Sequence, residues 1–201
     1  MGSEMCIRDS PEPGPERRRG QVNPTPDPAR LRQVFDRIEP MIEQRWGIPV
    51  TISDVPNPFT GDLDGERILV DHDLDLEDAV FILIHLFGHT VQWNASERAR
   101  EIAFAKHTVW TEDQLREVAA YEQQACRYSL QLLHEGGVHD LDQWVSDFAT
   151  CDTAYLMHFY KTGEKLAFRS FWRDGSPPLE PLEIPAFQPT RWISRYDGTV
   201  V

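Results

Sequence analysis

The chain has 201 residues, of which 40% are hydrophobic and 26% are charged, so it fits one globular domain rather than two. Its formal net charge of −13 repels phosphate backbones and anionic lipid surfaces, so neither nucleic acid nor a membrane is an expected partner. The longest apolar run, residues 79–87, is too short for the roughly 20 residues that span a bilayer. A soluble protein is expected.

The two ends of the chain differ from its middle. The first ten residues, MGSEMCIRDS, resemble the translation of an adapter used in sequencing libraries, and we interpret residues 1–10 as an artefact outside the fold. Residues 11–28 are rich in proline and are predicted to form a disordered lead-in, because they cannot bury enough apolar surface to fold. The domain is placed at residues 29–165. Residues 166–201 lack a helical period and are predicted to form an extended tail over it.

Cysteine usage indicates a reducing compartment. Without Cys6 of the adapter-like segment, Cys126 and Cys151 remain, and the sequence has no secretory hydrophobic region. Two cysteines in this context are more typical of a cytoplasmic protein than of a secreted protein that disulfides stabilise. A cytoplasmic location is therefore expected.

In chain order, the sequence predicts a helix followed by a small sheet. Apolar residues recur at helical spacing from Leu31 to Trp46, and Gly47 ends the helix. Residues 48–55 alternate as a strand does, and residues 67–71 form a second expected strand. The Pro, Asn and Gly cluster at residues 56–65 is predicted to hold turns between the two strands.

Three further helices are predicted after the sheet, each from an N-terminal capping pattern. The first is almost wholly apolar and is expected to be buried. The helices cover residues 76–93, 112 to about 133, and 141–162, with Asp75, Thr111 and Asp140 as their respective caps. The fold class is therefore α+β, a mainly helical domain with a small N-terminal sheet.

A pair of histidines stands out on the most apolar helix. His85 and His89 are four residues apart, so both imidazoles lie on one helix face and can reach one metal ion. Burying two such rings without partners would cost a few kcal/mol, which favours a shared ligand over two unrelated core histidines. A third ligand should come from another helix, and Glu122 lies on the helix expected to pack against this one; by spacing alone, an ordinary solvent-exposed helix glutamate is the alternative.

These segments resemble the ImmA/IrrE family of metallo-endopeptidases. Residues 84–89, IHLFGH, are similar to that family's HExGH helix, and residues 122–133, EQQACRYSLQLL, are similar to its ExxAN-x-FAxxLL helix. The preceding GIPV at residues 47–50 and ILVD at residues 68–71 extend the likeness to roughly residues 31–163. The resemblance implies a zincin-like fold in which the HxxxH segment is the active-site helix.

The resemblance also implies a function and a site. It implies that His85, His89 and Glu122 hold Zn²⁺, that the reaction is peptide-bond hydrolysis, and that the substrate is a protein or peptide such as a repressor-like regulator. The sequence departs from the family at two positions near this site. Cys126 replaces the family's asparagine, and we interpret it as a small buried hydrophobe rather than a fourth ligand.

The second departure concerns catalysis. Leu86 occupies the position of the glutamate that acts as general base in zincins, so the catalytic residue is unknown and activity is expected to be weak or lost. Glu97 and Glu101 are candidate substitute bases, although each has the character of a surface residue. Restoring the acid by Leu86→Glu would raise peptide hydrolysis if the scaffold for cleavage remains.

Three functions are therefore open. The first is a zinc metallopeptidase or its close descendant. The second is a non-catalytic, metal-stabilised module that binds a regulatory protein without cutting it, and Leu86 favours it. The third is a non-haem iron site, because two histidines and a carboxylate can also form a facial triad with open positions.

Overall fold

The computed structural model of the protein describes residues 25–56, 59–105, 107 and 109–192. In these ranges the chain forms five α-helices, a three-stranded sheet and one short 3₁₀ helix. The predicted α+β class, mainly helical with a small sheet, is confirmed. The adapter-like residues 1–10 and the lead-in up to residue 24 lie outside the described ranges. No helix of the described part is both long and apolar enough to cross a bilayer.

The first helix, α1 (Pro28–Trp46), begins three residues before the predicted start because Asp27 caps it. The Asp27 carboxylate accepts a hydrogen bond from Ala29 N at 3.0 Å. The helix ends at Gly47, whose φ of 69° is a left-handed conformation that glycine adopts without strain. Its buried face packs onto the core through Leu31, Val34, Phe35, Ile38 and Ile42.

The sheet has the strand order β1, β3, β2. The parallel strands β1 (Val50–Ser53) and β3 (Ile68–Asp71) lie within the two predicted strand segments. β2 (Gly61–Leu63) pairs antiparallel with β3, so the prediction that residues 56–65 hold only turns was wrong. Glycine and aspartate disfavour strands, and all three positions of β2 are buried, so no alternating pattern marks it.

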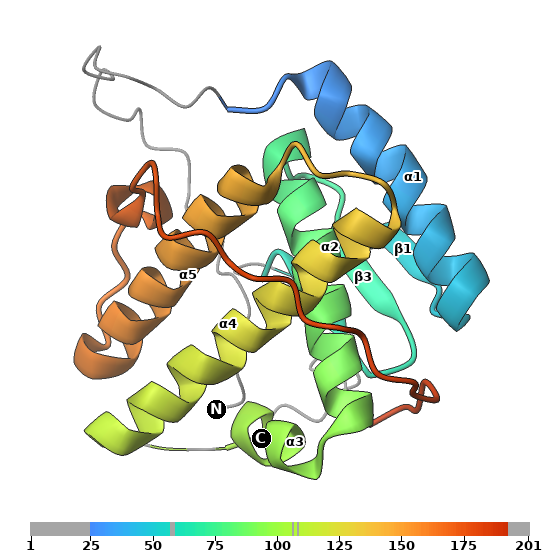
Figure 1. Ribbon diagram of the computed structural model, residues 1–201. Coiled ribbons are helices and arrows are strands. Elements are labelled where there is room, and N and C mark those ends of the chain that lie inside the picture. Colours follow the sequence, from blue (N-terminus) through green and yellow to red (C-terminus); the bar gives the residue numbers. More distant parts are fainter. Residues whose placement is uncertain (1–24, 57–58, 106, 108, 193–201) are drawn as a thin grey trace.

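Helix α2 (Leu76–Ala95) forms the buried centre of the molecule. The sheet and α1 lie on one side of it, and another helix, α4, crosses it on the other (Figure 1). The Asp75 carboxylate accepts a hydrogen bond from Asp78 N at 2.9 Å, so the predicted cap is present. Every residue from Val80 to Trp93 is buried, as the apolar sequence predicts.

Two helices, α3 and α4, follow α2 in the chain. α3 (Glu97–Ala103) was not predicted; Ser96, whose backbone is extended, ends α2 and caps α3. α4 (Glu112–Glu135) opens with the predicted capping box, in which Thr111 and Gln114 bond each other's backbone amide.

Helix α5 (Asp142–Thr162) lies beside α4 (Figure 1). The predicted cap by Asp140 is absent: α5 begins after Leu141, without a side-chain cap. Asp140 instead forms an ion pair with Arg30 of α1 at 2.6 Å. This charge-assisted contact joins residues 110 positions apart, and a local capping pattern could not reveal it.

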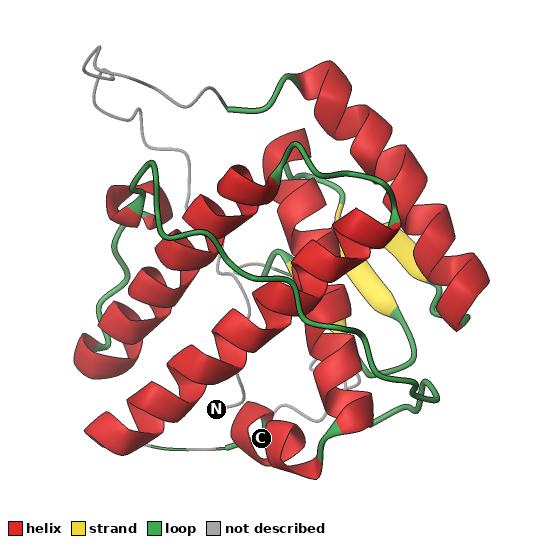
Figure 2. Cartoon of the chain, in the orientation of Figure 1, coloured by secondary structure: helices red, strands yellow, loops and turns green. Residues whose placement is uncertain are grey.

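The C-terminal segment, residues 172–192, runs across the outer face of α4 (Figures 1 and 2). It follows a 3₁₀ helix, η1 (Phe168–Phe171), and contains no helix or strand in its described length. Leu182 N donates to the carbonyl of Arg127 on α4 at 3.2 Å, and Trp192 N donates to the carbonyl of Asp64 beside the sheet at 2.6 Å. The segment thus bridges α4 and the sheet.

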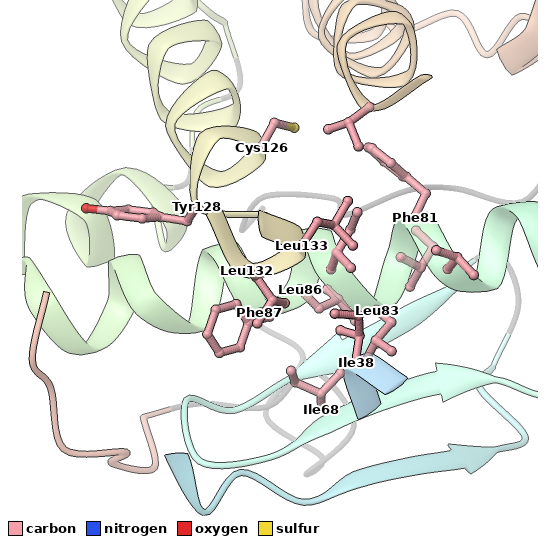
Figure 3. Close-up of a cluster of buried hydrophobic side chains, with 14 of the residues drawn as sticks. Ile38, Ile68, Phe81, Leu83, Leu86, Phe87, Cys126, Tyr128, Leu132 and Leu133 are labelled. Atoms are coloured by element: carbon pink, nitrogen blue, oxygen red, sulfur yellow. The ribbon is translucent and has the colours of Figure 1, made fainter. Parts of the chain in front are cut away.

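The main apolar core lies between α1, the sheet and α2, and continues beneath α4. Figure 3 shows Leu86 of α2 inside this core, facing other apolar side chains rather than solvent. Its labelled neighbours in the same cluster include Ile38, Ile68, Leu132 and Leu133.

Candidate metal centre

Three side chains from two crossing helices converge at one point between α2 and α4. His89 Nε2 lies 3.0 Å from His85 Nε2 and 3.1 Å from Glu122 Oε2, and the third separation, from His85 Nε2 to Glu122 Oε2, is 3.3 Å. Each of the three residues is at most 1% exposed. The candidate ligands from the sequence are therefore brought together, and their ligand atoms all face one another.

This convergence depends on the close approach of α2 and α4. Gly88 lies between the two histidines on α2, and a Cβ added there would stand 2.2 Å from the carbonyl oxygen of Ala125. Ser129 Oγ strengthens the contact by donating to the carbonyl of Ile84 at 2.8 Å. Because the helices touch at backbone distance, the Glu122 side chain reaches both imidazoles.

Gln92 fixes the proton position on His89. The Gln92 amide nitrogen donates to the carbonyl of Tyr121 at 2.8 Å, so its Oε1 is the atom that faces His89 Nδ1 at 2.9 Å. An amide oxygen accepts only, and His89 must therefore carry its proton on Nδ1. In the neutral ring, the lone pair is then on Nε2, the atom that faces His85 and Glu122. Such an outer partner is typical of metal-ligating histidines.

Cys126 lies beside His85, as Gln92 lies beside His89. Its Sγ lies 3.4 Å from His85 Nδ1, and burial, with the charges of Asp152 and Glu122, raises the pKa of the thiol well above its usual range. Cys126 is thus a neutral, buried side chain, as interpreted from the sequence, but it also contacts a candidate ligand. The His85 ring stacks on Phe81, with centroids 5.2 Å apart, which fixes its plane.

Glu122 is an ionised carboxylate. Burial alone would raise its pKa, but the charge of His89 and hydrogen bonds with both imidazoles outweigh burial and hold the pKa of Glu122 well below its usual range. A carboxylate that is ionised in a solvent-free site needs a positive partner. Either a proton on the imidazoles or a metal ion can supply that charge.

The donor set and its spacing fit a zinc ion. Donor atoms at about 2.0–2.2 Å from a tetrahedral Zn²⁺ lie roughly 3.3–3.6 Å from one another. The three observed separations, 3.0, 3.1 and 3.3 Å, are within a few tenths of an ångström of this range. Two neutral imidazoles and one carboxylate are also ligands that Zn²⁺ prefers.

Residue 86, where the resemblance would place a general base, is part of the core. Leu86 is fully buried, and its Cδ1 lies 2.8 Å from where a Cβ on Gly61 of β2 would stand. The side chain therefore packs against the sheet. The two candidate substitute bases lie on the surface: Glu97 is exposed, and Glu101 pairs with Arg98 at 2.8 Å.

The sequence analysis missed two polar residues of this site, Gln92 and Asp152. Gln92 is three residues after His89 on the same helix, a spacing that could have identified it as a partner. Asp152 Oδ2 lies 3.8 Å from His85 Nε2. Its signal was a carboxylate on the apolar face of the predicted third helix.

Gln92→Met is expected to lower metal affinity about 10- to 100-fold, because it removes the acceptor that fixes the tautomer of His89. The measurement is a competition titration of Zn²⁺ against a chromogenic chelator. Gln123→Met, an exposed position next to Glu122, is the matched control and should bind as the wild type does. Equal affinity of both variants would contradict this role for Gln92.

No model of a known protein family matches this sequence, and comparisons with curated proteins and with solved structures likewise give no match.

Proposed function

We propose that this protein is a metal-binding domain on a zincin-like scaffold, in which His85, His89 and Glu122 hold one Zn²⁺ ion that stabilises the helical layer. The observation that carries the proposal is the convergence of three ligand atoms within 3.3 Å in a site closed to solvent. In this proposal a protein partner, the class that the ImmA/IrrE resemblance implies, is bound rather than cleaved.

Burial of the site favours a structural metal over a hydrolytic one. A catalytic zinc keeps an open position for water and substrate, whereas structural sites are closed by protein ligands. Two surface pockets, of about 380 and 290 Å³, lie between α1 and α4 and between α3 and α4, and none of the three ligands lines either of them. The edge strand β2, where a peptide could add to the sheet, is itself buried.

The surroundings of the ligands support the same conclusion. Leu86 packs against the sheet, and Glu97 and Glu101 are exposed, so none of these three positions supplies a base at the metal. A non-haem iron centre would need open positions for oxygen, so closure also favours zinc over iron. Metal analysis of the purified protein identifies the ion.

Glu122→Gln is expected to lower zinc affinity by at least about 100-fold, because it replaces the only charged member of the three-residue set with a weaker ligand. The protein should also lose the rise in melting temperature that added zinc gives the wild type. Zinc content after gel filtration and thermal unfolding with and without Zn²⁺ measure the two effects.

Glu112→Gln is the control for this experiment. Glu112 lies at the start of the same helix and pairs with Lys161 at 3.0 Å on the surface, so its loss should leave zinc binding unchanged. Full zinc content and full zinc-dependent stabilisation in Glu122→Gln would contradict the proposed site. Zinc-dependent cleavage of an unstructured peptide by the wild type, abolished in His89→Ala, would contradict the structural role.

A further inference from the structure

A second buried carboxylate faces the candidate metal centre from a third helix. Asp152 of α5 is 1% exposed, and its Oδ2 lies 3.8 Å from His85 Nε2. The charge of Asp152 also acts on the neighbouring thiol of Cys126 and raises its pKa. Asp152 therefore lies beside the centre, next to His85.

The position of Asp152 is fixed by an aromatic contact one helical turn away. Phe81 and His85 are four residues apart on α2, and Phe148 and Asp152 are four residues apart on α5. The rings of Phe81 and Phe148 stack, with centroids 4.0 Å apart and planes 20° from parallel. Because residues four apart share a helix face, this stack aligns the next turn and sets Asp152 against His85.

The measured separation allows Asp152 and His85 to share one ion. Two donor atoms that are each about 2.1 Å from the same ion can be at most about 4.2 Å apart. The observed 3.8 Å is below this limit. For this pair, direct coordination needs no movement of α5 relative to α2; Asp152 lies outside the set whose ligand atoms are all within 4.8 Å of one another, so its side chain would turn toward the ion on binding.

Charge favours the same arrangement. Glu122 and Asp152 are two carboxylates in a region closed to solvent, and imidazoles, which are cations only when protonated, lie near both of them. A divalent cation balances two carboxylates while both imidazoles stay neutral. A net charge buried without such a partner would be costly.

We propose that Asp152 is the fourth ligand of the metal, so that two histidines and two carboxylates from α2, α4 and α5 enclose the ion. This inference rests on the proposed metal site and assigns it a closed coordination shell. A closed shell joins three helices through one ion and leaves no position for a substrate or an activated water.

The test uses the full chain loaded with Co²⁺, whose visible absorption reports coordination number. The wild type should show the intense bands of a four-coordinate ion, and added azide should leave the spectrum unchanged because no position is open. Asp152→Ala should bind Co²⁺ about tenfold or more weakly, and azide or formate should then change its spectrum by entering the vacated position.

Asp147→Asn is the matched control, since Asp147 is a buried carboxylate on the same helix. It accepts hydrogen bonds from Ser176 N at 2.7 Å and from the Gln143 amide at 3.0 Å, and these partners differ from the His85 imidazole that lies near Asp152. The Asp147→Asn change should lower the melting temperature. The Co²⁺ spectrum should stay as in the wild type and should still not change when azide is added. Asp152→Asn, which keeps the side-chain shape, serves if the alanine variant does not fold.

The outcomes separate this inference from the proposed function. Wild-type protein that binds no stoichiometric Co²⁺ would overturn the metal site itself. Wild-type protein that binds Co²⁺ but responds to azide would overturn only the role of Asp152. Unchanged Co²⁺ affinity and spectrum in Asp152→Ala would also overturn that role. Asp152 would then be a neighbour of His85 that does not coordinate the metal. A wild-type response to azide overturns the role of Asp152 even if neither variant folds.

Discussion

Gly88→Ala is expected to destabilise the protein by about 3 kcal/mol or more and to abolish stoichiometric metal binding. The new Cβ would stand 2.2 Å from the carbonyl oxygen of Ala125 and 2.8 Å from its carbonyl carbon. Both are backbone atoms that no rotamer change can move, so α2 and α4 must separate. His89 and Glu122, which face each other across this contact at 3.1 Å, would separate with them.

Helix propensity alone predicts the opposite effect, so the experiment distinguishes the two explanations. Alanine is favoured over glycine inside a helix by roughly 1 kcal/mol, so a position without the close contact would be stabilised by the same change. Urea unfolding and zinc content measure the outcome. Gly163→Ala is the control: its Cβ would meet nothing within 4 Å, so only its φ of 73° is unfavourable, at about 1–2 kcal/mol. A Gly88→Ala protein as stable as the wild type would contradict the close backbone contact between α2 and α4.

Leu86→Glu is expected to destabilise the protein by at least about 3 kcal/mol, and this loss should mask any gain in hydrolysis. Leu86 is fully buried beside β2, so the change removes core packing and places a carboxyl group among apolar side chains (Figure 3). The sequence-based idea that an acid at this position would restore cleavage assumes that residue 86 faces the metal. In the structure its side chain faces the sheet.

Two variants separate packing from charge at this position. Leu86→Met keeps the volume and the apolar character, so it should cost less than about 1.5 kcal/mol. Leu86→Gln introduces a polar group without a charge and should fall between the other two. Unfolding free energies and zinc-dependent peptide cleavage are measured on all three. A Leu86→Glu protein that remains stable and cleaves peptides would show that residue 86 can turn toward the metal after all.

The elements that sequence analysis predicted well are those with a long, regular signal. α2 was predicted because nearly every residue in it is apolar, and α4 because Thr111 and Gln114 form a capping pattern at its start and glycines follow its end. The parallel strands β1 and β3 carry the aliphatic residues that strands favour. β2 and α3 were missed because three and seven residues are too few to establish a period.

The candidate site was predictable where its residues share one helix. The spacing of His85 and His89 guarantees a common face, whatever the rest of the chain does. Glu122 was placed by resemblance, and the structure brings it to the same point. Asp152 could not be placed from sequence, because its contact with His85 depends on how α5 packs through the Phe81–Phe148 stack. Pairing across separate helices has no periodic signature.

The C-terminal segment gives this protein an outer layer whose opening can be followed separately from global unfolding. Its contacts with the rest of the chain include isolated amide bonds, such as Leu182 N to Arg127 and Trp192 N to Asp64, which no neighbouring helical or strand ladder reinforces. Amide protons held in this way exchange with solvent through local release, while protons inside α2 exchange only when the core opens. In native-state hydrogen exchange, Leu182 and Trp192 should therefore show lower free energies of opening than the amides of α2.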